Sequence, residues 1–269
     1  ARGTAYVGGA HIVEAFQYFD AETVGRAVSV WSLGLWGVFL LVGMVVVFFY
    51  SLDALYGDRK DRSVLFWKSL PVTDTQTVVS KLLTALIVAP VIGIVAVLGT
   101  TILSMIVASI AAMFQGVNPF GLLWTEVPFF RIVLSMVSLG LGMSIWFLPF
   151  VAWLFFASAA STRTPFLIAL LVPAGVAFAE KVAFNTSVFL ETISNYAGGF
   201  FENFGERMAE FGIRHNGGNF DDFVVNGDLP GPMDVVSALL DPALLVGLVI
   251  AAALLFLTIR MRHQRIDIG

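Results

Sequence analysis

Few side chains in this sequence have the types and spacing that catalysis or metal binding requires. None of the 269 residues is a cysteine, so the chain offers no thiolate nucleophile, disulfide or thiolate metal site. Its three histidines, His11, His215 and His263, lie far apart and lack ligand spacing. The H-E-x-x-H and G-x-S-x-G patterns are also missing. We therefore predict that the chain is not an enzyme and holds neither catalytic residues nor a metal.

The segment before residue 74 combines charged residues with large apolar ones. Asp61 is placed to cap a short helix over residues 62–69, and Pro71 disfavours helical geometry at Leu70. Large apolar side chains in a charged segment indicate a partner, which is either another protein or the lipid headgroup layer with Trp67 as an interface anchor. The residues alone leave both hypotheses open.

Two further patterns concern the ends of helices. Thr73-Asp74-Thr75-Gln76 fits a capping box and predicts the start of a helix that continues into the apolar stretch from Leu82. Glu180 and Lys181 lie near the end of another apolar stretch. They form either a pair that snorkels to the membrane surface or a candidate outer gate.

The composition identifies the elements that must position these residues. Hydrophobic residues make up 58% of the chain and charged residues 13%, about half of the ~25% charge of soluble domains. Such a chain cannot cover a surface that faces water, so we predict an all-α polytopic membrane protein. The net charge of −4 argues against a nucleic-acid partner.

Stretches without Asp, Glu, Lys or Arg locate the membrane spans, because a helix needs about 20 mostly apolar residues to cross the hydrocarbon core. They predict five transmembrane helices, over residues 28–50, 82–114, 132–158, 166–189 and 242–259. The fourth uncharged stretch is short, so its helix should continue through Glu180 and Lys181 toward Phe189. No stretch alternates as a membrane β-strand does.

The distribution of lysine and arginine predicts the orientation. Segments 51–81, 159–165 and 260–269 carry most of the positive charge and are expected to be cytoplasmic. Their positive residues are Arg59, Lys60, Arg62, Lys68, Lys81, Arg163, Arg260, Arg262 and Arg265. Segments 1–27, 115–131 and 190–241 are then expected outside. This places the C-terminus in the cytoplasm of a multi-pass protein, which we assign to a bacterial inner membrane.

An N-terminus outside the cell is hard to explain from the printed residues. The sequence starts with Ala1, and residues 1–27 contain no apolar core of signal-peptide length. We therefore expect a sixth span upstream of Ala1, which would place both termini of the intact protein in the cytoplasm.

The outer segment before the last span contains a helical pattern. Phe189, Ile193, Tyr196 and Phe200 follow one another at three- and four-residue steps, which predicts an amphipathic helix, interrupted at Gly198-Gly199 if at all. The following segment to residue 241 either covers the outer exit of a transport route or only caps the helices.

Three groups of residues together resemble the cytoplasmic loop of ABC-2 type transporter permeases. They are Asp61-Arg62-Ser63, Leu70-Pro71-Val72-Thr73-Asp74, and Lys81 before a long apolar helix. In that family a charged residue near the second helix precedes a short helix, a Leu-Pro-Val-Ser/Thr turn and a lysine. The resemblance covers the whole chain in its layout but only about residues 53–90 as a motif, and the missing first span departs from the family pattern.

This resemblance implies one transmembrane permease domain over residues 1–269 and export driven by ATP. The chain lacks G-x-x-x-x-G-K-[S/T], so ATP and Mg²⁺ would be bound by a separate ATPase subunit, and this chain itself would need no cofactor. A second permease subunit, most simply an identical one in a homodimer, and the lipid bilayer are the other implied partners. The coupling helix that would contact the ATPase comprises Asp61, Arg62, Leu65, Phe66, Trp67, Lys68, Leu70 and Pro71. Asp58, Arg59 and Lys60 would help to set its register.

Two other functions stay open at this point. An ion-driven secondary transporter would need ionisable residues deep in the membrane, and the predicted spans have none near mid-depth. A membrane scaffold that transports nothing is the other alternative. Spans rich in Phe, Leu and Val suit an amphipathic or lipid-like substrate, although the same residues face ordinary lipid.

Overall fold

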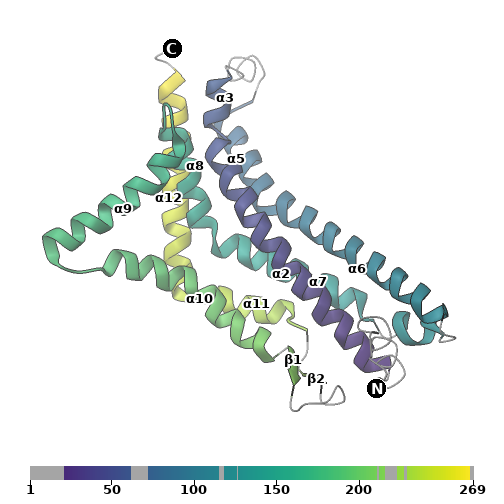
Figure 1. The fold of residues 1–269 in the computed structure, drawn as a ribbon. Coiled ribbons are helices and arrows are strands. Elements are labelled where there is room, and N and C mark those ends of the chain that lie inside the picture. The colour runs from purple at the N-terminus through teal and green to yellow at the C-terminus, as the bar shows by residue number, and fades with distance from the viewer. Residues whose placement is uncertain are drawn as a thin grey trace, which may run out of the picture. The chain divides into compact units, whose positions relative to one another are not determined.

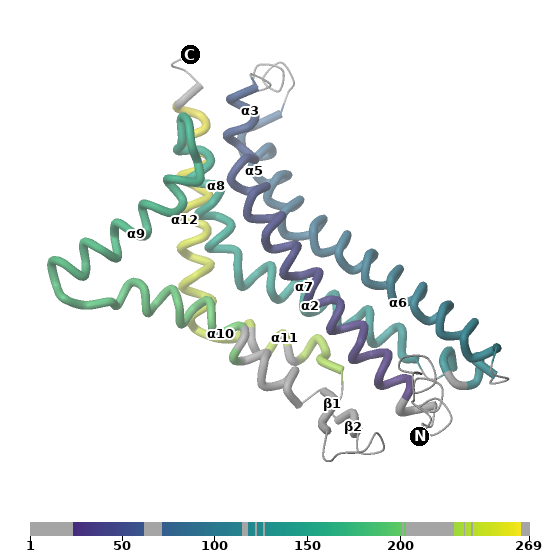
Figure 2. Tube along the Cα trace, viewed as in Figure 1, coloured from purple at the N-terminus to yellow at the C-terminus, as the bar shows by residue number. Residues whose placement is uncertain are grey.

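The structure is a computed structural model that describes residues 21–61, 72–114, 118–125, 127–210, 212–215, 223–226 and 229–266. Five of the described helices are long and apolar enough to cross a membrane, as the sequence predicts. These candidate spans are Val24–Lys60, Asp74–Phe114, Phe129–Trp146, Pro165–Phe184 and Pro242–Gln264. Figure 1 shows the elements in order, and Figure 2 follows the same chain as a tube with the undescribed residues in grey.

The first two spans extend further than the apolar stretches that predict them. Helix α2 runs over Ala21–Asp53 and is followed by the short helix α3, Tyr56–Lys60. Helix α5, Asp74–Leu83, begins at the predicted capping box, which is confirmed because the Gln76 N–H donates to Thr73 Oγ1 and the Thr73 N–H donates to Gln76 Oε1. A π-helical turn, Thr84–Val88, connects α5 to α6, Ala89–Phe114.

The third apolar stretch does not form the single helix expected over residues 132–158. Helix α7 comprises Phe129–Trp146, and α8 comprises Leu148–Ala160, so the two helices are separated only by Phe147. The cause is Pro149, which lies in the first turn of α8. Proline has no N–H, and its ring would clash with the carbonyl of residue 145 in a continuous helix. A second π-helical turn, Phe120–Trp124, precedes α7.

The fourth span is shorter than expected. Helix α9, Pro165–Phe184, passes Glu180 and Lys181 but does not reach Phe189, because Asn185 takes a left-handed conformation with φ 52° and ends the helix. Helix α10 then runs without a break from Val188 to Glu210, through Gly198-Gly199. Its predicted amphipathic character is confirmed where side chains are described: Phe200 is buried and Tyr196 half-buried, whereas Glu191 and Asn195 are exposed.

The remaining elements complete the chain. Strands β1, Gly212–His215, and β2, Phe223–Asn226, pair antiparallel with Ile213 opposite Val225. They are an exception to the all-α prediction, and strands of four residues give too short an alternation to be recognised in a sequence. Helices α11, Pro232–Leu239, and α12, Pro242–Ile266, follow. Helix α12 continues past the predicted end at residue 259, so the basic tail is helical as far as Ile266.

The described residues form two compact units. Unit 1 lies within Ala1–Phe39, Gly93–Ser138 and Glu206–Pro232, and unit 2 within Leu40–Ile92, Leu139–Gly205 and Met233–Gly269. In unit 1, α2 and α6 approach each other where the Ser32 and Thr101 hydroxyls lie 3.2 Å apart. In unit 2, α8 packs against α12 and α9.

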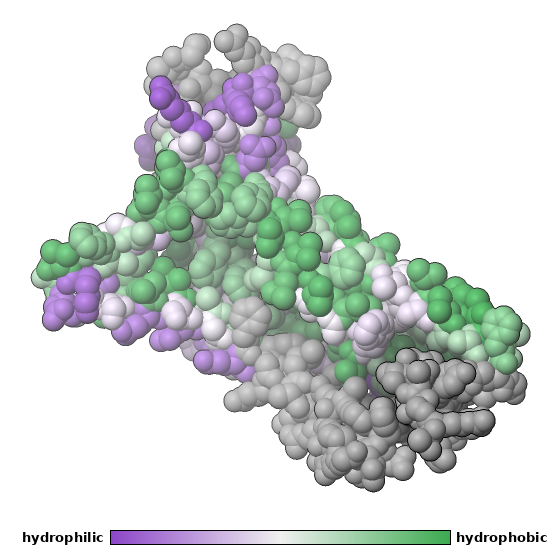
Figure 3. All heavy atoms as spheres, viewed as in Figure 1, coloured by the Kyte–Doolittle hydropathy of each residue, from purple (hydrophilic) through white to green (hydrophobic). Residues whose placement is uncertain are grey.

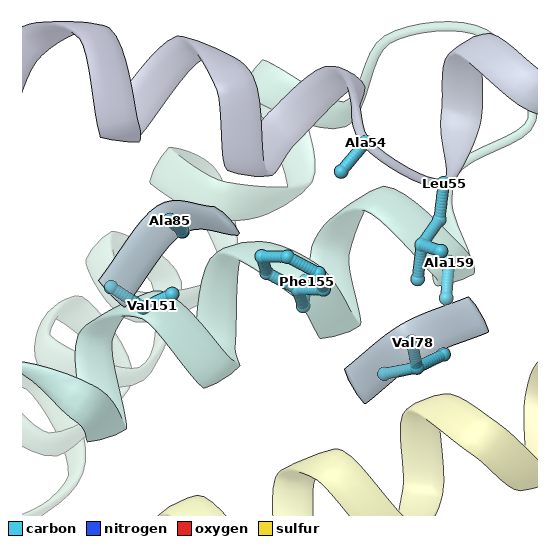
Figure 4. Packing of buried hydrophobic residues seen from close by; sticks show 7 residues of the cluster. All are labelled: Ala54, Leu55, Val78, Ala85, Val151, Phe155 and Ala159. Carbon is cyan, nitrogen blue, oxygen red and sulfur yellow. The ribbon is translucent and has the colours of Figure 1, made fainter. Parts of the chain in front are cut away.

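The core of unit 2 has two parts. The first contains Ala54, Leu55, Val78, Ala85, Val151, Phe155 and Ala159 (Figure 4). These residues join the end of α2, the beginning of the second span and α8, which is the helix with the most buried residues of this unit. Hydrophilic residues gather at the end of the unit that holds α3 and the C-terminal part of α12, whereas hydrophobic side chains cover α9 (Figure 3).

The second part of the core attaches α10 to α7 and α12. We call it the aromatic cluster; it comprises Trp146, Phe147, Phe150, Tyr196 and Phe200. Trp146 Nε1 donates to the Tyr196 carbonyl and the Tyr196 hydroxyl donates to the Trp146 carbonyl, both at 2.9 Å. Burial raises the pKa of this hydroxyl to about 12, and the charge of Asp241 adds to the effect. The hydroxyl therefore stays protonated, as its donor role requires.

Substitution of Gly247 tests the packing of α12 against Tyr196 of α10. A Cβ at Gly247 of α12 would lie 2.7 Å from Tyr196 Cζ, whereas one at Gly43 of α2 would meet nothing within 4 Å. We expect Gly247→Ala to destabilise the protein by about 1–3 kcal/mol through overpacking. Gly43→Ala should be neutral or stabilising, because alanine favours helix by up to ~1 kcal/mol. Thermal unfolding in detergent measures both, and equal midpoints for the two variants would contradict the contact between α10 and α12.

Candidate functional site

The predicted coupling helix lies mostly outside the described residues. Asp61, at the end of α3, is described and exposed. Arg62, Leu65, Phe66, Trp67, Lys68, Leu70 and Pro71 fall in the range 62–71, which the structure does not describe. What the structure does describe is how the chain is attached on both sides of this segment.

The attachment is a group of charged side chains in unit 2, which we call the charge cluster: Asp58, Asp74, Lys81 and Arg262. They come from α3, from α5 and from the C-terminal part of α12, which lie at the same end of unit 2 (Figures 1 and 2). Residues separated by up to 204 positions in the sequence thus form one network.

Lys81 connects the second span to the end of the first. Its Nζ lies 2.7 Å from Asp58 Oδ2 and also donates to the carbonyl of Ala54. The carbonyl of Lys81 accepts a hydrogen bond from the Tyr50 hydroxyl at 3.3 Å. Lys81 therefore joins α5 to α2 and α3 through both its side chain and its backbone.

Arg262 lies at the centre of the cluster. Its Nε donates to Asp74 Oδ1 at 2.9 Å, and its Nη1 lies 3.4 Å from Asp58 Oδ2. The side chain is only 7% exposed, so both carboxylates are needed to offset the cost of burying its charge. His263 Nδ1 lies 3.5 Å from Asp74 Oδ2, but this imidazole is largely exposed to solvent. Arg262 thereby connects the last span to both ends of the segment that contains residues 62–71.

Arg59 makes a second attachment, to the end of α8. Its guanidinium donates to the carbonyls of Ala159 at 2.8 Å, of Ser161 at 3.0 Å and of Ser158, and its Nε donates to Leu55 O at 3.3 Å. The last carbonyls of a helix have no partner within the helix and form the negative end of its dipole, so a cation is favourable there.

The serine next to these carbonyls completes the junction. Ser158 Oγ accepts hydrogen bonds from the N–H groups of Leu55 and Tyr56, at 3.1 and 3.0 Å. The hydroxyl is buried and thus satisfies two donors that the break between α2 and α3 leaves free. Together, Arg59 and Ser158 fix α3 to α8.

These contacts add to the sequence interpretation. Asp58 and Arg59 were expected to help set the register of the coupling helix on a partner subunit, and this stays a prediction. The structure shows that both side chains also contact groups of this chain. Periodicity contained a signal for the role of Arg262: Leu255, Ile259 and Arg262 lie at helical spacing, and the first two pack against the core of unit 2. The expected end of the helix at residue 259 obscured it.

The arrangement connects helices and has no evident catalytic chemistry. In the ranges that the structure describes, no group of three His, Cys, Asp or Glu residues could hold a metal ion. The charge cluster joins α3 and α5, which flank residues 62–71, to α12, and the contacts of Arg59 and Ser158 join α3 to α8. A displacement of the flanked segment would thus be transmitted to two helices of the membrane domain.

Glu180 and Lys181 occupy different environments. The Glu180 carboxylate accepts hydrogen bonds from the Thr186 hydroxyl and from the N–H groups of Val188 and Phe189, at 2.7, 2.7 and 2.9 Å. It therefore caps the N-terminus of α10, where backbone donors are free. The Lys181 side chain is exposed. These contacts give Glu180 a local structural role, and the outer gate stays a prediction.

Comparisons of the chain with protein-family models, with curated proteins and with solved structures find no match. The interpretation of the site therefore depends on its geometry and on the sequence.

Removal of the central guanidinium tests the charge cluster. Arg262→Gln should lower the free energy of unfolding by about 2–3 kcal/mol, because two carboxylates lose a charged donor in a partly buried site. Arg260→Gln, two residues away on the exposed side of α12, should cost less than about 1 kcal/mol. Denaturation in detergent compares the two variants. A cost for Arg260→Gln as large as that for Arg262→Gln would show that the position in the cluster does not matter.

Proposed function

We propose that the chain is the membrane-spanning permease subunit of an ABC exporter that uses ATP hydrolysed by a separate ATPase subunit. The observation that supports this most is the double attachment of the segment 62–71. Arg59, three residues before it, holds α3 to α8, and Asp74, three residues after it, holds α5 to α12. A subunit driven from outside the membrane needs such a connection between its contact segment and its spans.

The sequence of the attached segment fits a partner subunit. Phe66, Trp67 and Leu70 are the apolar anchors for a groove on an ATPase, where a few aromatic side chains commonly supply most of the binding energy. The chain has no phosphate-binding loop of its own, so ATP and Mg²⁺ would bind to that partner. The excess of lysine and arginine at this end supports a cytoplasmic location, with the C-terminus on the same side.

The spans support ATP rather than an ion gradient as the energy source. The five predicted spans contain no charged residue near mid-depth that could carry a proton or sodium ion through the membrane, and Glu180 and Lys181 lie about one turn from the outer end of the fourth. Spans rich in apolar residues fit an amphipathic or lipid-like substrate, moved across a bacterial inner membrane. A second permease subunit, in a homodimer, would complete the transport route, since five or six helices rarely enclose one alone.

Recovery of the ATPase subunit tests the proposal. Trp67→Ala and Phe66→Ala should each reduce the amount of ATPase recovered with the purified chain by roughly tenfold or more, because a buried aromatic anchor at an interface is commonly worth about 2 kcal/mol or more. Trp31→Ala is the control, since Trp31 is an exposed tryptophan of α2 outside the contact segment. Pull-downs at matched expression measure this effect. Undiminished recovery with both aromatic variants would refute the assignment of the contact segment.

A further inference from the structure

The second span contains a wide turn close to the core of unit 2. The five residues Thr84–Val88 form a π-helical turn between α5 and α6, in which the Ala89 N–H donates to the carbonyl of Thr84, five residues back. π-Turns within α-helices are rare, and the extra residue in such a turn changes the direction in which the following side chains point around the helix axis. Ala85 in this turn is buried in the core cluster with Val151 and Phe155 (Figure 4).

Pro90 explains why the turn is wide. In a continuous α-helix, the N–H of residue 90 would donate to the carbonyl of Leu86, but proline has no N–H and its ring would clash with that carbonyl. In a membrane no water is present to satisfy the freed carbonyl, so a side-chain donor and a local π-turn are the usual solutions.

The replacement donor comes from the neighbouring helix α7. Ser144 Oγ donates to the carbonyl of Leu86 at 2.8 Å. The same hydroxyl lies 2.8 Å from the carbonyl of Gly140, one turn earlier in its own helix. A hydroxyl has a single hydrogen, so Ser144 can donate to only one of two acceptors at a time. These are the carbonyl of Leu86 in the π-helical turn and the carbonyl of Gly140 in α7.

The turn also lies between the charge cluster and the long apolar part of the second span. Helix α5 carries Asp74 and Lys81, which bind Arg262 and Asp58. A π-turn and an α-turn of the same residues differ in their rotation per residue. Conversion of one into the other therefore rotates α5 about its axis relative to α6 and moves both charged side chains.

We propose that Thr84–Val88 is a hinge of the second span, and that the Ser144 hydroxyl holds its wide form by bonding to the Leu86 carbonyl. When this hydroxyl turns to Gly140, the hinge is free to tighten toward α-helix and α5 rotates. Ser144 is a positioning residue in this arrangement. The part of the hinge in transport rests on the proposed function, but the hinge itself belongs to this chain alone.

Distance measurements between two spin labels test the rotation. The chain has no cysteine, so Thr75→Cys on α5 and Gln264→Cys on α12, both exposed positions, are labelled specifically. Pro90→Ala restores the N–H that favours the α-turn, and we expect a new maximum in the distance distribution. Pro173→Ala in α9 is the control and should leave the distribution unchanged. A Pro90→Ala distribution identical to that of the parent chain would overturn the proposal.

A cycle of substitutions tests the role of Ser144. Ser144→Ala should lower the unfolding midpoint by ~3–6 °C, because a part-buried carbonyl loses its donor. Ser144→Thr keeps the hydroxyl and should recover most of the loss. Ser138→Ala is the matched control, since that hydroxyl on α7 donates only within its own helix, to Leu134. In the Pro90→Ala background, Ser144→Ala should have less than half its effect, because the restored N–H serves Leu86.

Two results of the cycle would overturn the hinge. One is an equal shift for Ser144→Ala and Ser138→Ala, and the other is simple additivity of Ser144→Ala and Pro90→Ala. All of these variants are measured on the full chain in lipid nanodiscs without an ATPase. Failure of the hinge is therefore distinguishable from failure of the proposed function, which is tested by recovery of the partner.

Discussion

The guanidinium of Arg262 imposes the strongest constraint on unit 2. It is 7% exposed, and a buried cation is tolerated only where carboxylates and hydrogen bonds offset its desolvation. Asp58, near the end of the first span, and Asp74, at the start of the second, must therefore be held at the end of α12. This requirement fixes where the chain leaves and re-enters the helices around residues 62–71, whatever those residues bind.

In the apolar part of the molecule, the main constraint is hydrogen bonding of backbone N–H and carbonyl groups rather than the pairing of charges. In a membrane a freed N–H or carbonyl needs a partner within the protein, and three interruptions of helices are matched by a specific donor or acceptor. Pro90 is matched by Ser144, the junction of α2 and α3 by Ser158, and the start of α10 by Glu180. Ser144, Ser158 and Glu180 are thus placed where helices end or deviate from regular geometry.

The sequence predicted the elements better than their connections. Five apolar stretches and the capping box at Thr73 were recognisable because they depend on local composition and local hydrogen bonds. The break at Phe147 and the end of α9 at Asn185 were missed because uncharged stretches mark where a helix can lie and not where its backbone turns. Periodicity also predicted the inner face of α10, including Tyr196 and Phe200.

The charge cluster could not have been predicted from the sequence in the same way. In the sequence, Lys81 was recognised as part of the resemblance to the permease loop, Arg262 as a member of a basic segment, and Asp58 as one of the charges expected to set the register of the coupling helix. Their pairing depends on how α2, α5 and α12 pack against one another. This packing is determined by core residues such as Val78 and Phe155, which are distant from one another in the sequence. The contacts of Arg59 with α8 were missed for the same reason, since Ala159 and Ser161, whose carbonyls accept from it, lie 100 and 102 positions away.

The central claim is that the charge cluster transmits movement from the contact segment to the spans. The most direct measurement uses a fluorophore on Phe256→Cys, an exposed position of α12, in the chain assembled with the ATPase subunit that we propose as its partner. Addition of ATP and Mg²⁺ should change the fluorescence of the parent chain. With Arg262→Gln we predict unchanged recovery of the ATPase but loss of this ATP response, and partial retention with Arg262→Lys. A full ATP response in the Arg262→Gln chain would contradict the claim.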